Sequence, residues 1–127
     1  MFKRIDHAEI IPSNVEQTID FYVNILGFKV KSRQAMDRPP MKEIVYLELG
    51  DTVIELIAAD NPTPKSEEAW QVQYRGIALE VENMDEAVAH LKGKGVEIAI
   101  PPVDLGDSFR GEIRDPDGLI IELREWK

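Results

Sequence analysis

The sequence predicts an α+β fold made of two tandem βαβββ modules. Three observations predict it: short runs typical of strands, one amphipathic helical stretch near the start of each half, and turns rich in Gly, Pro and Asn between them. At 127 residues, with 43% hydrophobic residues, the chain suits one globular domain with its own core. We expect module 1 at 1–58, a connector at 59–75 and module 2 at 76–127.

Module 1 begins with a predicted half-buried strand over 5–11. Ser13 or Asn14 can cap the helix that follows over 15–26, and Gly27 is placed to end that helix. A loop is expected at 37–40. The remaining strands of this module are predicted at 28–32, 42–49 and 52–57.

The connector carries Pro62 and Pro64 and has the polar composition of a linker. Module 2 then repeats the order, with a helix capped by Asn83 or Asp85 and ended by Gly95. Its strands are predicted at 77–81, 96–100, 109–114 and 119–123, with a loop at 101–107.

The last predicted strand follows the turn signal Asp115-Pro116-Asp117-Gly118 and holds one carboxylate, Glu122, among apolar residues. Glu55 has the same setting in the strand at 52–57. A carboxylate in an apolar run either faces solvent or is held where a cationic partner needs it.

Matched landmarks indicate a duplication. The helix-ending glycines give 95 − 27 = 68, the two carboxylates give 122 − 55 = 67, and the helix starts at Val15 and Met84 give 84 − 15 = 69. Three separate features therefore repeat at nearly one offset, as expected for two copies of one structural unit.

The composition excludes several classes of function. The chain has no cysteine, so disulfides, a thiolate nucleophile and Cys-based metal sites are excluded. Its formal charge of −9 opposes binding to nucleic acid or an anionic membrane. No apolar stretch is long enough to span a bilayer or to act as a signal peptide, and we expect a cytoplasmic protein.

These modules resemble the vicinal oxygen chelate superfamily, which includes glyoxalase I, methylmalonyl-CoA epimerase, extradiol dioxygenases and bleomycin- or fosfomycin-resistance proteins. The resemblance implies an incomplete barrel around a central cavity, with one metal ligand from each of four strands. The motifs that carry it are Ile5-Asp6-His7-Ala8, Thr18-Ile19-Asp20-Phe21-Tyr22 with Leu26-Gly27-Phe28, Val53-Ile54-Glu55-Leu56, Ile77-Ala78-Leu79-Glu80-Val81 and Asp115-Pro-Asp-Gly with Ile121-Glu122-Leu123.

Carried over to this sequence, the resemblance implies His7, Glu55 and Glu122 as metal ligands. The chain departs from the family at Gly76, which stands where a second His is usual and has no side chain to offer. One imidazole and two carboxylates suit Mg²⁺, Mn²⁺, Fe²⁺, Co²⁺, Ni²⁺ or Zn²⁺. Because oxygen-activating members use two His, a dioxygenase or fosfomycin-resistance activity is not expected.

The implied function is that of a lyase or isomerase acting on a small substrate with vicinal oxygens, such as a hemithioacetal or an acyl thioester. By analogy to glyoxalase I, the reaction would pass through an enediolate-like intermediate, with Glu55 or Glu122 as the catalytic base. Arg38, Arg110 and Arg124 are candidates for binding an anionic group of the substrate. The sequence does not identify the substrate or the metal.

The alternative is a non-catalytic, small-molecule-binding protein of the bleomycin-resistance type, in which the three side chains would be relics or would hydrogen-bond the ligand. Under either hypothesis we expect a homodimer, with modules paired within one chain or across two. We interpret His90 as a helix-surface or packing residue, and not as a site residue. Glu9 and Glu80 are interpreted as matched positions beside the ligands, suited to an outer-sphere role or to exposed polarity.

Overall fold

The computed structural model describes all residues, 1–127, and confirms the α+β fold with two βαβββ modules. The chain divides into two compact units, Met1–Pro64 and Lys65–Lys127. Each unit holds one four-stranded mixed sheet, and neither sheet closes into a barrel. Neither helical segment has the length and apolar character needed to span a bilayer.

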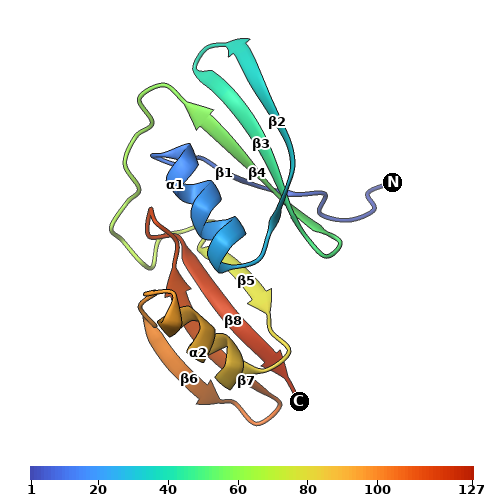
Figure 1. Ribbon diagram of the computed structural model, residues 1–127, viewed down its shortest axis with the longest axis vertical. Helices are drawn as coiled ribbons and strands as arrows, with labels where there is room; N and C mark the ends of the chain where they lie inside the picture. The colour runs from blue at the N-terminus through green and yellow to red at the C-terminus, as the bar shows by residue number, and fades with distance from the viewer. The chain divides into compact units, whose positions relative to one another are not determined.

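The sheet of module 1 has the strand order β1-β4-β3-β2, with β1 parallel to β4 and the other pairs antiparallel. Asn14 caps the helix by accepting a hydrogen bond of 3.0 Å from the Gln17 amide, as one of the two predicted caps. The elements are β1 (Ala8–Ile10), α1 (Val15–Asp20), the π-helical turn η1 (Phe21–Ile25), β2 (Lys29–Arg38), β3 (Met41–Leu49) and β4 (Thr52–Ala59) (Figure 1).

Module 2 repeats this topology, with the strand order β5-β8-β7-β6 and a parallel pair between β5 and β8. Its helix is also capped by an asparagine, since the Asn83 side chain accepts from the Glu86 amide at 2.9 Å. The predicted duplication is therefore visible in the topology and in the caps. The elements are β5 (Gly76–Glu80), α2 (Met84–Gly93), β6 (Ile100–Asp104), β7 (Ser108–Arg114) and β8 (Ile120–Trp126).

Alternation along the strands divides each sheet into an apolar face and a polar face. In β4, Ile54 and Leu56 are buried on one side and Glu55 points to the other. In β8, Ile121 and Leu123 are buried on one side and Glu122 points to the other. In each sheet, the predicted carboxylate therefore lies on the face opposite the core residues.

The turn before β8 is the one that the sequence predicts. The Asp115 side chain accepts hydrogen bonds from the amides of Asp117 and Leu119, each at 2.9 Å. Gly118 adopts φ of 82°, which favours glycine. This turn sets the register that places Glu122 opposite Glu112 on β7.

The prediction for the sixth strand is wrong. The chain over 96–99 forms no strand, and β6 occupies Ile100–Asp104, where a loop was expected. Pro101 and Pro102, which lack an amide N–H, lie in the stretch that was expected to be a loop. However, β6 is an edge strand, and an edge strand can carry proline where no ladder hydrogen bond is needed.

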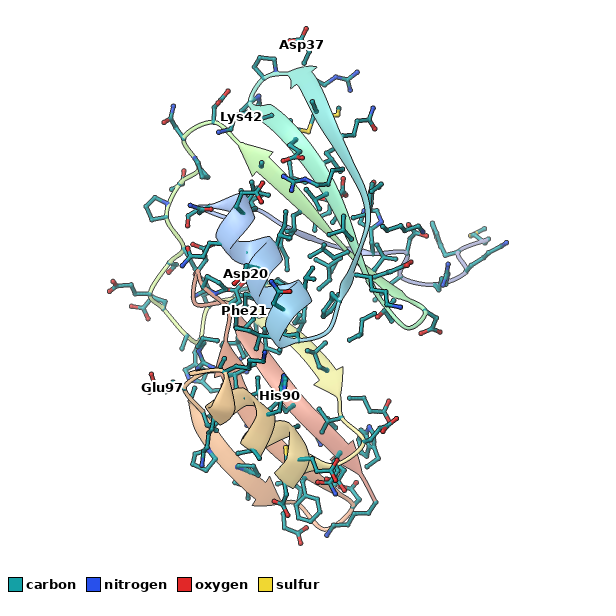
Figure 2. The ribbon with its side chains drawn as sticks, in the orientation of Figure 1. Asp20, Phe21, Asp37, Lys42, His90 and Glu97 are labelled. Carbon is teal, nitrogen blue, oxygen red and sulfur yellow. The ribbon has the colours of Figure 1, made fainter.

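Several other strand ends differ from their predictions. The first strand is shorter, so that His7 lies immediately before β1, and the second strand continues to Arg38 in a hairpin with β3. Asp37 and Lys42 lie at the tip of this hairpin (Figure 2).

Gly76 occupies the position in module 2 that His7 occupies in module 1. Glu9 lies opposite Glu55 in the first parallel pair, and Ala78 lies opposite Glu122 in the second. His7 lies two residues before Glu9, and Gly76 lies two residues before Ala78. A Cβ atom on Gly76 would come within 2.3 Å of the Ile120 carbonyl oxygen, so the backbone leaves no room for a side chain.

We expect Gly76→Ala to lower the free energy of unfolding by about 1–3 kcal/mol, because the added methyl group forces β5 away from β8. Chemical denaturation of the metal-free protein measures this change. Gly93→Ala in α2 is the matched control, since a Cβ there meets nothing within 4 Å, and alanine should be neutral or stabilising by less than about 1 kcal/mol. Equal stability of the Gly76→Ala variant and the unmodified protein would contradict the close packing.

Candidate metal centre

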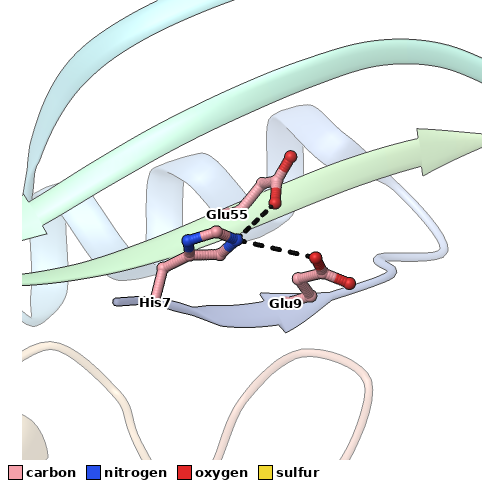
Figure 3. Close-up of side chains that lie close together, drawn as sticks. All are labelled: His7, Glu9 and Glu55. Atoms are coloured by element: carbon pink, nitrogen blue, oxygen red, sulfur yellow. Dashed lines mark ion pairs between the residues drawn. The ribbon is translucent and has the colours of Figure 1, made fainter. Parts of the chain in front are cut away.

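Three ligand-type side chains meet where β1 runs beside β4. The His7 Nε2 atom lies 2.9 Å from Glu55 Oε2 and 3.5 Å from Glu9 Oε1 (Figure 3). One ligand atom from each of the three side chains lies within 4.8 Å of the others. The structure thus brings together His7 and Glu55, two of the predicted ligands, and adds Glu9.

Glu55 is a buried carboxylate, with 6% of its surface exposed. A buried negative charge is costly without a partner, and His7 supplies a hydrogen-bonding group that can carry positive charge. Tyr46 lies opposite Glu55 on β3. Partial burial and then the charge of Glu55 raise the pKa of Tyr46.

His7 is oriented from both of its ring nitrogens. Its Nδ1 atom lies 2.9 Å from Asp6 Oδ2, and the Tyr46 ring meets the imidazole edge-on, with 5.9 Å between ring centroids. The hydrogen bond to Asp6, with the negative charge of Glu55, raises the pKa of His7 despite partial burial. A carboxylate on Nδ1 that leaves Nε2 to face other ligands is the arrangement found around metal-bound histidines.

The donor set of this cluster fits a divalent metal ion. An imidazole with two carboxylates suits Mn²⁺, Fe²⁺, Co²⁺, Ni²⁺ and Zn²⁺, and three protein ligands leave positions for a substrate. Glu55 is buried and Glu9 is exposed, so the cluster extends from the sheet to solvent. Module 1 alone therefore supplies a chemically suitable set of donors.

Glu122 has different partners within module 2. Its carboxylate accepts from Arg110 Nε at 2.8 Å and from Arg124 Nη2 at 2.6 Å. Burial opposes ionisation of Glu122, but these hydrogen bonds outweigh it and lower the pKa of Glu122. Two of the three arginines proposed for an anionic substrate group are thus bound to the third proposed metal ligand.

Glu112 is the polar residue that sequence reasoning missed. It lies opposite Glu122, is fully buried, and contacts Arg110, Arg114 and Arg75. The signal for it was the alternation of Arg110, Glu112 and Arg114 along β7, which puts all three charges on one face. Like charges directly opposite each other destabilise a strand pair, and the arginines offset this repulsion.

Three other residues lie away from these clusters. The prediction that Glu9 and Glu80 are matched positions is wrong, because Glu80 lies opposite Arg124, two residues beyond the register of Glu9. His90 is exposed on α2, as predicted (Figure 2). Arg38 is exposed at the end of β2.

Comparison with known proteins supports the resemblance. Residues 4–123 match the model of the Glyoxalase/Bleomycin resistance protein/Dioxygenase superfamily. The chain is 34% identical over 127 residues to the uncharacterized protein YaeR of Escherichia coli strain K12, covering 97% of this chain and 96% of YaeR.

Two relatives have named activities. The chain is 30% identical over 138 residues to lactoylglutathione lyase of Neisseria meningitidis serogroup A, covering 98% and 91% of the two chains. It is 27% identical over 132 residues to human mitochondrial methylmalonyl-CoA epimerase, covering 96% and 73%. Among solved structures, a glyoxalase family protein from Enterococcus faecalis has a TM-score of 0.84 and 32% identity, with 98% of each chain covered.

We expect the contribution of His7 to stability to depend on pH. Its pKa is raised above the ordinary value of 6.5, so its stabilising interactions are fully present below that pH and are lost as the pH rises through the folded-state pKa. The loss of stability caused by His7→Gln should therefore be largest below pH 6.5 and shrink as the pH rises above that value. Denaturation of both metal-free proteins below and above this pH measures it.

Asp6→Asn serves as the companion variant, because the hydrogen bond that His7 donates to Asp6 is the largest cause of the raised pKa of His7. Titration of the His7 ring by NMR should show a lower pKa in this variant. An unchanged His7 pKa would contradict the orientation of His7 by Asp6.

Proposed function

We propose a metal-dependent lyase or isomerase activity for this chain, which belongs to the Glyoxalase/Bleomycin resistance protein/Dioxygenase superfamily. The substrate is a small molecule with vicinal oxygens, of the hemithioacetal or acyl-thioester type. The observation that carries the proposal is the contact of 2.9 Å between His7 Nε2 and the buried carboxylate of Glu55. Similarity to a lactoylglutathione lyase and a methylmalonyl-CoA epimerase supports this choice of chemistry.

His7 and Glu55 are the proposed primary ligands of one divalent ion. We also propose Glu122 as the ligand from module 2. To bind the ion, the Glu122 carboxylate must give up its contacts with Arg110 and Arg124. Glu9 is the alternative third ligand, because it already lies beside His7. Either choice leaves open positions for two substrate oxygens.

The bound ion would supply Lewis-acid polarisation of a substrate carbonyl, which acidifies the neighbouring C–H group. A carboxylate of this chain then moves the proton. We favour Glu55 over Glu122 for this role, because the arginines lower the pKa of Glu122 and so make it a weaker base. Burial of Glu55 in β4 also shields the proton transfer from bulk water.

The proposed functional unit is a single domain, 1–127, in which modules 1–58 and 76–127 act together through the connector 59–75. We propose that it forms a homodimer and works in the cytoplasm. Superfamily members bind small molecules and often dimerise, which supports the proposed small-molecule substrate and the homodimer.

A non-catalytic binding protein of the bleomycin-resistance type is the second candidate. Two observations favour it: Gly76 leaves no room for a second His, and the Glu122 carboxylate is engaged by two guanidiniums. Under this alternative His7 and Glu55 would hydrogen-bond each other or a ligand, and no metal would be needed.

We expect the protein to bind one Ni²⁺, Co²⁺, Zn²⁺ or Mn²⁺ ion per chain, and His7→Ala or Glu55→Gln to weaken binding by at least about 100-fold. Titration calorimetry on untagged protein measures the affinity. Comparison of Glu9→Gln with Glu122→Gln identifies the third ligand, because only loss of a true ligand lowers the affinity strongly.

The control is Glu97→Gln, since Glu97 is an exposed carboxylate outside both clusters (Figure 2). This variant should bind metal like the unmodified protein. No saturable uptake of any of the four ions would favour the non-catalytic alternative.

We expect the metal-loaded protein to catalyse hemithioacetal isomerisation or methylmalonyl-CoA epimerisation. Glu55→Gln should lower kcat/KM by at least about 100-fold, since it removes both a ligand and the proposed base. Steady-state assays with each metal measure this. A fully loaded protein that turns over neither substrate class, or a Glu55→Gln variant of unchanged activity, would contradict the assignment.

A further inference from the structure

Four guanidiniums gather on the polar face of the sheet in module 2. They belong to Arg75, which precedes β5, to Arg110 and Arg114 on β7, and to Arg124 on β8; we call them the arginine cluster. The carboxylates of Glu112 and Glu122 hold them in ion pairs. In a chain with a formal charge of −9, this face carries a local excess of positive charge.

Glu112 and Glu122 cannot accept all the hydrogen bonds that the four guanidiniums of the arginine cluster can donate. Glu112 alone receives Arg110, Arg114 at 3.0 Å and Arg75 at 3.5 Å. Each guanidinium has five N–H donors, and Arg75 uses only its Nη2 group on a carboxylate while its Nε atom is buried without a partner. Donors therefore remain in the cluster after its internal ion pairs are made.

The arginine side chains remain partly accessible, although the Glu112 carboxylate beneath them is not. Glu112 is fully buried, whereas the side chains of Arg75, Arg110 and Arg114 are 35%, 24% and 38% exposed. The Trp70 ring lies 4.7 Å from the Arg75 guanidinium carbon, and Trp126 lies 5.1 Å from that of Arg124. Aromatic stacking limits the motion of two of the four side chains, which prepares their donors for a ligand.

Two further acidic groups, Glu80 and Asp107, make no direct ion pair with the cluster. Glu80 lies on the same face of β5 but makes no ion pair with the cluster. Asp107 reaches Arg124 only through the Ser108 hydroxyl, which contacts both side chains. The matched positions in module 1 also differ: Tyr46 lies opposite Glu55 where Glu112 lies opposite Glu122, and Ile44 takes the place of Arg110.

We infer that the arginine cluster binds an oxyanion group, a carboxylate or a phosphate, through the free donors of Arg75, Arg110 and Arg114. Guanidiniums bind both groups in a bidentate manner, and three around one buried carboxylate provide charge for a further anion. If the bound anion is part of the substrate, the inference rests on the proposed function, and the substrate carries an anionic group, its anionic arm. Anion binding itself involves module 2 only and needs no metal.

The test is an NMR titration of the metal-free full chain with inorganic phosphate, and separately with acetate, at constant ionic strength. We expect saturable shifts of the Nε–Hε signals of Arg75 and Arg114, with a dissociation constant on the order of millimolar. Arg75→Gln and Arg114→Gln should each weaken binding by about fivefold or more. The phosphate and acetate arms show which oxyanion the cluster prefers.

The matched control is Arg33→Gln. Arg33 also binds two carboxylates, Glu16 and Glu43, but as a single guanidinium it leaves no excess of positive charge. The Arg33→Gln variant should bind both anions like the unmodified protein. Arg114→Lys keeps the positive charge but loses the paired N–H donors of the guanidinium, and should bind more weakly than the unmodified protein. Unsaturable shifts, or equal weakening by Arg33→Gln, would overturn the inference.

Because these titrations use metal-free protein, their outcome is independent of metal binding at His7 and Glu55. Anion binding without metal uptake would leave the arginine cluster intact as a site and refute only the proposed enzyme. Metal uptake and turnover without anion binding would refute only the anionic arm.

Discussion

The parallel pairing of β1 with β4 is the constraint on which the candidate site depends. It sets Glu9 opposite Glu55 and brings His7, two residues earlier, to the same carboxylate. Since Glu55 is buried although it points away from the core residues Ile54 and Leu56, its carboxylate requires a partner at this position. The imidazole meets that requirement when protonated, and a divalent cation meets it when the imidazole is neutral.

The same pairing in module 2 leads to a different chemistry. Gly76 replaces the histidine and lies too close to Ile120 to carry a side chain, while Glu112 replaces the tyrosine opposite the carboxylate. Two carboxylates face to face then require cations of their own, and arginines supply them. Duplicated backbones thus present a metal-type donor set in module 1 and a guanidinium-rich face in module 2.

The sequence predicted the features that local rules control. Asparagine caps and the Asp115 turn act over a few residues, so both helices and the turn before β8 were found correctly. Strand β6 was misplaced because proline on an edge strand and proline in a loop look alike in sequence. Glu112 was missed because its partners, Arg75 among them, come from separate segments that only the sheet register joins.

The central claim is that His7 and Glu55 together hold a divalent cation, and location of the ion tests it most directly. Anomalous diffraction from crystals of the full chain grown with Ni²⁺ or Zn²⁺ would show where the ion lies. The claim predicts one ion per chain with His7 Nε2 and a Glu55 oxygen about 2.0–2.2 Å from it. An ion bound elsewhere, with the hydrogen bond between His7 and Glu55 intact, would contradict the claim.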